Sequence, residues 1–208
     1  MLDAMQIPTH ELFAVLIAVS FAAGLNVYAT VATLGLLAHF GAFPLPPALQ
    51  LLSGWQVIAI SGILFLVELF ADKIPVFDLL WNALQTFVRV PVAALLAYGA
   101  TAQLSPGWQL FATLLGGLIA LAAHGGKTAV RAAVTPYPEP FSNVTLSLGE
   151  DVLAVFLTWL ATRHPYWAAM MALALVLVVV VLIRWIVRAL RNMLRRAGKE
   201  LDLIVDKV

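Results

Sequence analysis

The sequence predicts an all-α, polytopic membrane protein of about six transmembrane helices, and three observations support that prediction. Of the 208 residues, 62% are hydrophobic and 11% are charged, and the mean hydropathy is +0.97. Soluble domains carry about 25% charged residues, so a water-soluble fold of this size could not bury so much apolar surface. The apolar residues form long stretches, and the basic residues concentrate on alternate loops and at the C-terminus.

Each predicted span is an apolar stretch, and about 20 such residues are needed to cross a hydrocarbon core of about 30 Å. Segments rich in Pro and Gly separate the stretches. The six predicted spans are 12–40, 57–70, 92–104, 108–123, 146–160 and 167–187. The segment 77–90 is only moderately apolar, so it either extends the short third span or forms a re-entrant or interfacial helix.

The spans form one transmembrane domain over residues 1–183, followed by a cytoplasmic tail over residues 184–208. No basic region precedes the first apolar stretch, which is too long for the core of a signal peptide, so we expect it to remain as a span. The loops 41–55 and 105–107 contain no Lys or Arg, whereas the alternate loops do. This asymmetry predicts that both termini are cytoplasmic, with Arg163 as the one exception.

The tail is basic and has a helical pattern of its own. It holds seven of the twelve Lys and Arg residues, beginning at Arg184. Its apolar residues recur at spacings of four and three from Ile183 to Val208, which is a heptad pattern. A coiled coil would make the protein a homo-oligomer, whereas the arginine density and Trp185 favour a long amphipathic helix on anionic membrane lipid.

A weak internal repeat relates two halves, 11–105 and 108–183. The stretch 12–16 recurs at 110–114, and the Arg-x-Pro motif at 89–91 recurs at 163–165. Three spans separate the copies, so the second half would be inverted relative to the first, as in transporters whose sites lie between inverted halves. Short apolar matches also arise by chance in a chain with this composition.

Two acidic clusters lie inside or at the ends of apolar stretches, where an ionisable group is costly unless it pairs or lines a wet cavity. Glu68 and Asp72 are four residues apart and share a helix face, with Lys73 beside them. Glu150 and Asp151 are adjacent, so one carboxylate can face a cavity while the other meets a neighbouring helix. Both clusters are candidate ion or substrate ligands; the alternatives are an interfacial ion pair at 72–73 and carboxylates at headgroup level at 150–151.

Other polar residues of the predicted spans can complete such a site. His124, Lys127 and Arg131 close the fourth span with a basic face that can balance the carboxylates, hold an anion or reach the headgroups. Asn26 lies in the middle of the first span and shares a face with Thr30. A buried amide needs partners, so Asn26 either lines the pathway or bonds to a neighbouring helix.

Several kinds of chemistry are excluded or disfavoured. The chain has no cysteine, so it has no thiolate ligand or Cys nucleophile. Its four histidines lack ligand spacing, and no serine-hydrolase elbow, zinc-protease or dinucleotide motif occurs. We therefore expect no cofactor, no nucleic-acid partner and no enzymatic activity, and the identity of any metal stays open. An intramembrane enzyme acting on a lipid-linked substrate is the alternative.

Four motifs carry a family resemblance: Gly-Leu-Asn-Val-Tyr at 24–28, Ala-Asp-Lys-Ile-Pro at 71–75, His-Gly-Gly-Lys at 124–127 and Ser-Leu-Gly-Glu-Asp at 147–151. With these motifs the chain resembles an uncharacterised bacterial membrane family, domain of unknown function four-one-two-six. The resemblance extends to about residue 163. It implies a multi-pass protein of the bacterial inner membrane and supplies no substrate or catalytic residue.

The main functional hypothesis is a small ion-coupled transporter or channel-like permease with a carboxylate-lined site for an ion or small molecule. We expect Glu68, Asp72, Glu150 and Asp151 to bind the ion or substrate. The residues expected around them are Asn26, His124, Lys127 and Arg131. The alternative is a scaffold or lipid-interacting protein that transports nothing and whose buried charges only neutralise one another.

Overall fold

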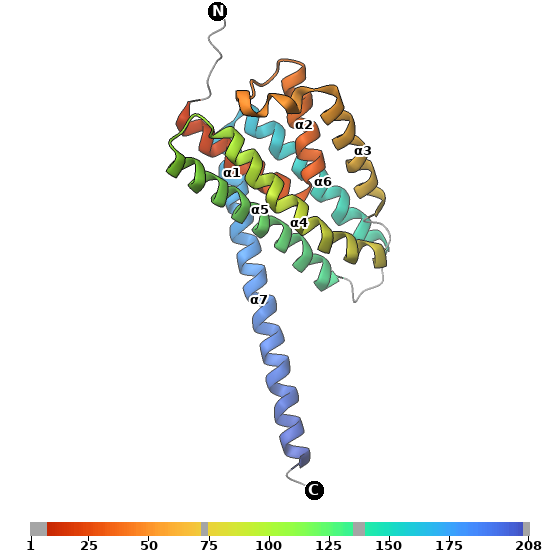
Figure 1. Cartoon of the computed structure of the whole chain (residues 1–208). Helices are drawn as coiled ribbons and strands as arrows, with labels where there is room; N and C mark the ends of the chain where they lie inside the picture. Colours follow the sequence, from red (N-terminus) through yellow and green to blue (C-terminus); the bar gives the residue numbers. More distant parts are fainter. Residues whose placement is uncertain (1–7, 72–74, 135–139, 206–208) are drawn as a thin grey trace, which may run out of the picture.

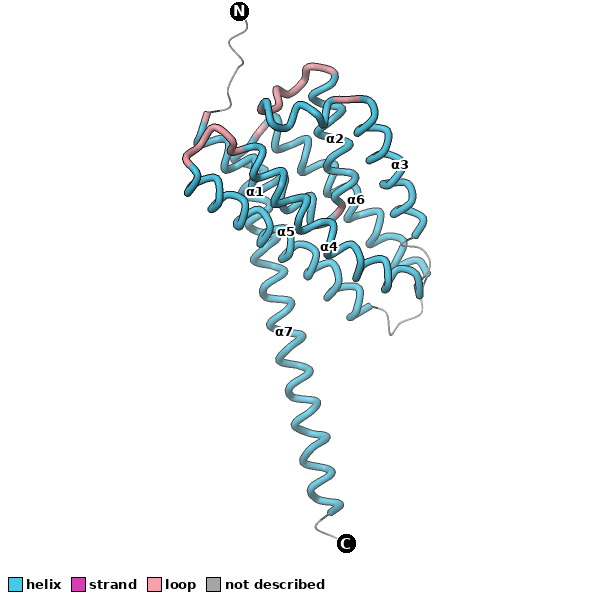
Figure 2. The backbone as a smooth tube through the Cα atoms, in the orientation of Figure 1, coloured by secondary structure: helices cyan, strands magenta, loops and turns pink. Residues whose placement is uncertain are grey.

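The structure is a computed structural model that describes residues 8–71, 75–134 and 140–205. Within these ranges every regular element is helical, which confirms the predicted all-α class. The helices are α1 (Thr9–Leu25), α2 (Val27–His39), the short 3-10 helix η1 (Pro47–Ser53), α3 (Trp55–Ala71), α4 (Pro75–Ala100), α5 (Pro106–Val134), α6 (Pro140–Arg163) and α7 (Pro165–Val205). Figure 2 shows the loops that lead from α2 through η1 to α3 and from α4 to α5.

Helix α1 is the centre of the bundle. Its residues are apolar on every side, and a helix of this kind is stable only when protein or lipid surrounds it. Leu12, Phe21 and Ala22 are 1%, 2% and 0% exposed, and α1 packs against α4, α5, α6 and α7. At Gly24 the backbones approach so closely that an added Cβ would lie 2.4 Å from the carbonyl oxygen of Ala120 on α5.

The predicted first span is wrong as a single helix, because the chain breaks at Asn26. This residue has an extended backbone, with φ −150° and ψ 103°, and its side chain caps α2 by accepting from the amide of Ala29 at 2.9 Å. Asn26 therefore does not share a helix face with Thr30, whose hydroxyl instead donates to the Asn26 carbonyl at 2.9 Å. With 17 and 13 residues, α1 and α2 span about 25 and 20 Å, short of a full crossing.

The pair α1–α2 folds back on itself. Leu12, near the start of α1, lines the same pocket as Ala38, near the end of α2, together with Gln103. The ring of Phe13 also packs against Trp108 at the start of α5, with centroids 6.0 Å apart. Both ends of the pair thus lie at one end of the bundle, which we call the upper end, as in Figure 1; it includes the loops 40–54 and 101–105.

The remaining helices run between the upper end and the opposite, lower end, where α3 and α5 finish. Helices α4 to α7 are long and apolar enough to cross a membrane, and η1 with α3, bent by 64°, makes a fifth candidate. The described helices therefore contain four candidate crossings, or five if η1 and α3 form one span, beside the folded-back pair; six spans were predicted. Helix α1 starts at the upper end and α7 finishes beyond the lower end (Figure 1). The placement of both termini on one side of the membrane stays a prediction.

Two open questions from the sequence concern α4 and the internal repeat. Helix α4 is continuous from Pro75 to Ala100, so the segment 77–90 extends the third span. The repeat stays unconfirmed. Its matched Arg-x-Pro motifs occupy different places, since Pro91 lies inside α4 and Pro165 begins α7.

The predicted long C-terminal helix is confirmed. Helix α7 has 41 residues and is about 60 Å long, twice the thickness of a hydrocarbon core. Its first part packs against α1, α5 and α6, and the rest leaves the bundle at the lower end (Figure 1). Self-association through this helix stays a prediction.

The two adjacent glycines of α5 provide a test of how α7 is held. An added Cβ at Gly126 would lie 2.4 Å from Val179 of α7, whereas one at Gly125 would meet nothing within 4 Å. We expect Gly126→Ala to lower the free energy of unfolding by about 1–3 kcal/mol through overpacking. Gly125→Ala should raise it by about 0.4–1 kcal/mol by stiffening the unfolded chain.

Unfolding in mixed detergent micelles measures both changes, and Val179→Ala in the Gly126→Ala background should recover most of the loss. Equal effects of the two glycine variants would contradict the close contact between α5 and α7.

Candidate functional site

A buried ion pair between α3 and α4 forms the core of the site. Glu68 is fully buried on the last turns of α3, and Arg89, also fully buried, lies in the middle of α4. The Arg89 guanidinium donates a hydrogen bond to the Glu68 carboxylate. Sequence reasoning counted Arg89 as a loop residue, but its side chain lies inside the bundle because α4 extends back to Pro75.

Lys127 of α5 connects the two predicted acidic clusters. Its ammonium lies 3.6 Å from Glu68 Oε1 and 3.1 Å from Glu150 Oε2, and its side chain is 0% exposed. Arg131, one turn further along α5, holds the same Glu150 oxygen at 3.1 Å. The structure therefore brings together carboxylates about eighty positions apart in the sequence, on α3 and α6, around one shared ammonium.

His124 links this cluster to α4 through both ring nitrogens. Arg89 Nη1 lies 3.0 Å from His124 Nδ1, and Thr86 Oγ1 lies 2.7 Å from Nε2. A guanidinium can only donate, so Nδ1 accepts, the imidazole is neutral and Nε2 carries the proton toward Thr86. The histidine thus orients the arginine.

Asp151 lies at the break between α1 and α2. It is 4% exposed, and its Oδ1 accepts from the Asn26 amide at 2.7 Å. Glu150 turns the other way, toward Lys127 and Arg131, as the angle of about 100° between adjacent helical residues requires. The carboxylate of Asp151 thus lies near the N-terminus of α2, where the helix dipole favours negative charge.

Sequence reasoning missed three polar residues of α4: Gln85, Thr86 and Arg89. Gln85 is 2% exposed and donates to the Tyr28 hydroxyl at 3.1 Å. A signal was present, because the polar residues at 78, 82, 85 and 89 are spaced by four, three and four, which places them on one helix face.

The predicted site residues of the network are Glu68, His124, Lys127, Arg131 and Glu150. Asn26 and Asp151 form a separate pair at the helix break, and Asp72 lies outside the described residues, as does Lys73. Over the described parts of the chain, Glu68 and Glu150 pair with the three cations Arg89, Lys127 and Arg131, while Asp151 accepts from the Asn26 amide. Counting Asp151, three carboxylates balance three cations when all six are ionised. No group of three or more His, Cys, Asp and Glu that could hold a metal occurs among the residues described.

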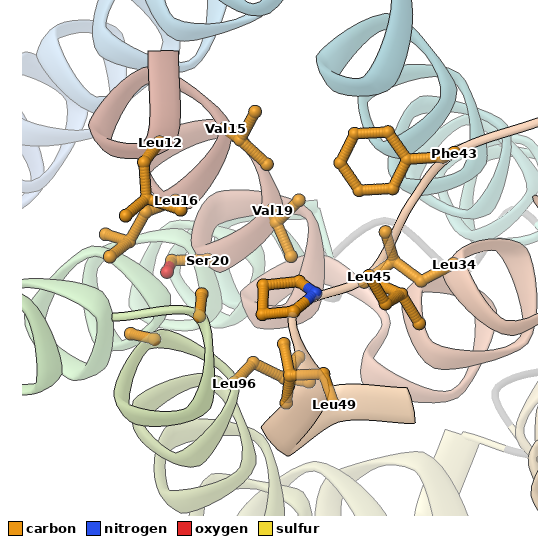
Figure 3. Close-up of a pocket in the computed structure, with 13 residues that line it drawn as sticks. Leu12, Val15, Leu16, Val19, Ser20, Leu34, Phe43, Leu45, Leu49 and Leu96 are labelled. Carbon is orange, nitrogen blue, oxygen red and sulfur yellow. The ribbon is translucent and has the colours of Figure 1, made fainter. Parts of the chain in front are cut away.

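A hollow leads from the upper end toward the network. A pocket of about 680 Å³ opens between the loop 40–46 and the end of α4. It shares Leu12 and Phe43 with a deeper cavity of about 40 Å³, which reaches Ser20 and Ala97. Figure 3 shows this cavity, lined by apolar side chains apart from Ser20. Ser20 is one turn from Gly24, whose carbonyl lies 3.5 Å from Arg89 Nη1.

Comparison with known proteins gives one match. A family model described as a domain of unknown function (DUF4126) matches residues 13–185. No curated protein and no solved structure matches the chain.

Proposed function

The chain belongs to the DUF4126 family, whose description carries no activity, and we propose from the geometry of the site that it is a proton-coupled membrane transporter. The observation that carries this proposal is the buried ammonium of Lys127, which lies between Glu68 and Glu150. A cation shared by two carboxylates on different helices can pair mainly with one of them or mainly with the other. Coupled transport requires an element with two such arrangements.

The switching step follows from the contacts. A proton arriving on Glu68 removes one of the two carboxylates that hold Lys127, so the ammonium pairs with Glu150 alone. Arg89 then keeps its bond to His124, while α3 loses its ionic link to α5. A proton on Glu150 has the opposite effect and loosens α6 from α5, where Arg131 is also bound.

The break at Asn26 supports the same proposal. Transporters commonly place ion sites at discontinuous helices near the middle of the bilayer, where free helix ends meet the ligand. Here the N-terminus of α2 meets the buried carboxylate of Asp151 through Asn26. The deeper cavity of the hollow reaches Ser20, one helical turn from Gly24, so the hollow approaches this level from the upper end.

The same proposal includes an orientation. Arg184, Arg188 and Arg191 lie exposed on α7, whereas Lys127 and Arg131 are buried and say little about sidedness. The positive-inside rule therefore places the lower end and the tail in the cytoplasm of the bacterial cell. The upper end, with the start of α1, then faces the outside of the inner membrane.

Flux through proteoliposomes tests the proposal. We expect the wild-type protein to carry protons inward under an imposed potential, and Glu68→Gln and Glu150→Gln to reduce flux to the level of protein-free liposomes. Glu11→Gln, on a carboxyl group at the start of α1 and outside the network, is the matched control and should keep full flux. A wild-type protein that moves no protons, alkali cations or chloride would contradict the proposal.

A second candidate, a non-transporting scaffold, is favoured by the balance of three carboxylates against three cations. It predicts that exchanging the partners, Glu68→Arg with Arg89→Glu, preserves both folding and cellular function. The transporter predicts that a folded exchange variant has no flux, because the acceptor for Lys127 has moved from α3 to α4.

A further inference from the structure

A groove separate from the hollow at the upper end lies between α3 and α6, with a volume of about 440 Å³. Phe65 and Leu69 of α3 form one wall, and the other is a face of α6 that includes Val155, Phe156 and Trp159. Asp151 is the one ionisable group among the described residues that line it. The groove therefore joins the surface of the bundle to the acidic side chain at the helix break.

The groove opens to the hydrocarbon. Val155, Phe156 and Trp159 are 38%, 42% and 41% exposed, and they lie on the segment of α6 that is apolar enough to cross a membrane. Asp151, at 4% exposure, lies deeper, and Asn26 holds one of its oxygens at 2.7 Å. The second oxygen, Oδ2, is buried as well, so the carboxylate lies behind the apolar lining of the groove. A molecule dissolved in the bilayer can enter the groove without passing through water, and its charge would then lie beside the buried Asp151 side chain.

We propose that this groove binds a lipophilic organic cation, a quaternary ammonium or phosphonium centre on an apolar body, as the substrate of the transporter. That the cation is transported rests on the proposed function; that it binds in the groove does not. A volume of about 440 Å³ lies within the range of about 300–1,000 Å³ typical of small-molecule sites.

The residues that line the groove favour a positively charged ligand. The carboxylate attracts a cation in a medium of low dielectric constant, where an anion beside it would be strongly repelled. Aromatic faces add to this preference, because a cation over the ring of Trp or Phe is stabilised by the ring quadrupole. The aliphatic side chains contact the apolar body of the cation, which stays in apolar surroundings when it moves from the lipid into the groove.

The bound cation also affects the network. Asp151 is adjacent to Glu150, which holds Lys127 and Arg131 at 3.1 Å each. A new positive charge at Asp151 repels both cations, so Lys127 shifts toward Glu68 on α3. Substrate binding thus biases the shared ammonium in the same direction as a proton on Glu150.

Binding of tetraphenylphosphonium to the full-length protein in lipid nanodiscs, measured by calorimetry against empty nanodiscs, tests the site. We expect saturable binding that weakens at least about tenfold in Asp151→Asn, a change of about 1.4 kcal/mol. Val155→Trp, which fills the groove, should weaken it similarly. The matched control is Val180→Trp on α7, where the exposed fraction is 37% against 38% at Val155, and it should leave binding unchanged.

Tetraphenylborate has the same shape and the opposite charge, so the wild-type protein should not bind it saturably. Equal binding of the two ions, or full tetraphenylphosphonium binding in both Asp151→Asn and Val155→Trp, would overturn the proposal. Saturable, Asp151-dependent binding in a protein that shows no flux would leave the site standing and refute only the transport function.

Discussion

Glu68→Met is expected to lower the free energy of unfolding by about 3–5 kcal/mol, the cost of leaving a buried charge without its partner. Arg89, on α4, is 0% exposed and bonded to Glu68, and the methionine side chain offers it no charged acceptor. Methionine has a volume close to that of glutamate, so the loss reports the charge rather than a cavity. Unfolding in mixed micelles measures it.

The double variant Glu68→Met with Arg89→Met is the control for this prediction. Replacing a whole buried ion pair by apolar residues is often neutral or stabilising, so the double variant should be more stable than either single variant. Lys127 still has Glu150 as an ionic partner in this background, at 3.1 Å in the wild-type structure. Additive losses in the two single variants would mean that the pair contributes nothing beyond its separate side chains.

Asn26→Ala is expected to have the second largest effect and to lower the free energy of unfolding by about 2–5 kcal/mol, because the Asn26 side chain makes two stabilising contacts. It caps α2, which is worth about 0.5–2 kcal/mol, and it donates to the Asp151 carboxylate, which is worth about 1.5–3 kcal/mol. Asn26→Ser keeps an oxygen for the cap and loses the amide donor, so it should show only the second part of the loss.

The background Asp151→Asn separates the two contributions independently. In that background Asn26 bonds to a neutral amide instead of a carboxylate. Asn26→Ala should therefore lower the free energy of unfolding by less than it does in the wild-type protein. An unchanged cost would show that the contact between Asn26 and Asp151 adds no stability, and that the break in the helix is held by the cap alone.

The candidate site was partly visible in the sequence. Glu68, Glu150 and Lys127 stood out because charged side chains inside apolar stretches are rare and costly. Arg89 and Thr86 did not, because the segment 77–90 could be either an extension of the third span or a re-entrant or interfacial helix. Their spacing on one face was readable, but the neighbours facing them, Glu68 and His124, lie on other helices.

The break at Asn26 could not be predicted from local preference. Asn is only a moderately poor helix former, and the apolar pattern runs through it without interruption. What stops the helix is the gain from two contacts, the cap on Ala29 and the bond to Asp151, 125 positions away. The prediction of the first span as one helix failed for that reason.

By itself the sequence determined the all-α membrane class, the long C-terminal helix and the presence of buried charge, because composition and apolar length are properties of contiguous residues. Only the tertiary structure decided that α1–α2 folds back, that Lys127 joins Glu68 to Glu150, and that Asp151 borders a groove between α3 and α6. These depend on which side chains from distant helices meet, and the lowest free energy for a buried charge is set by partners that no local stretch of sequence contains.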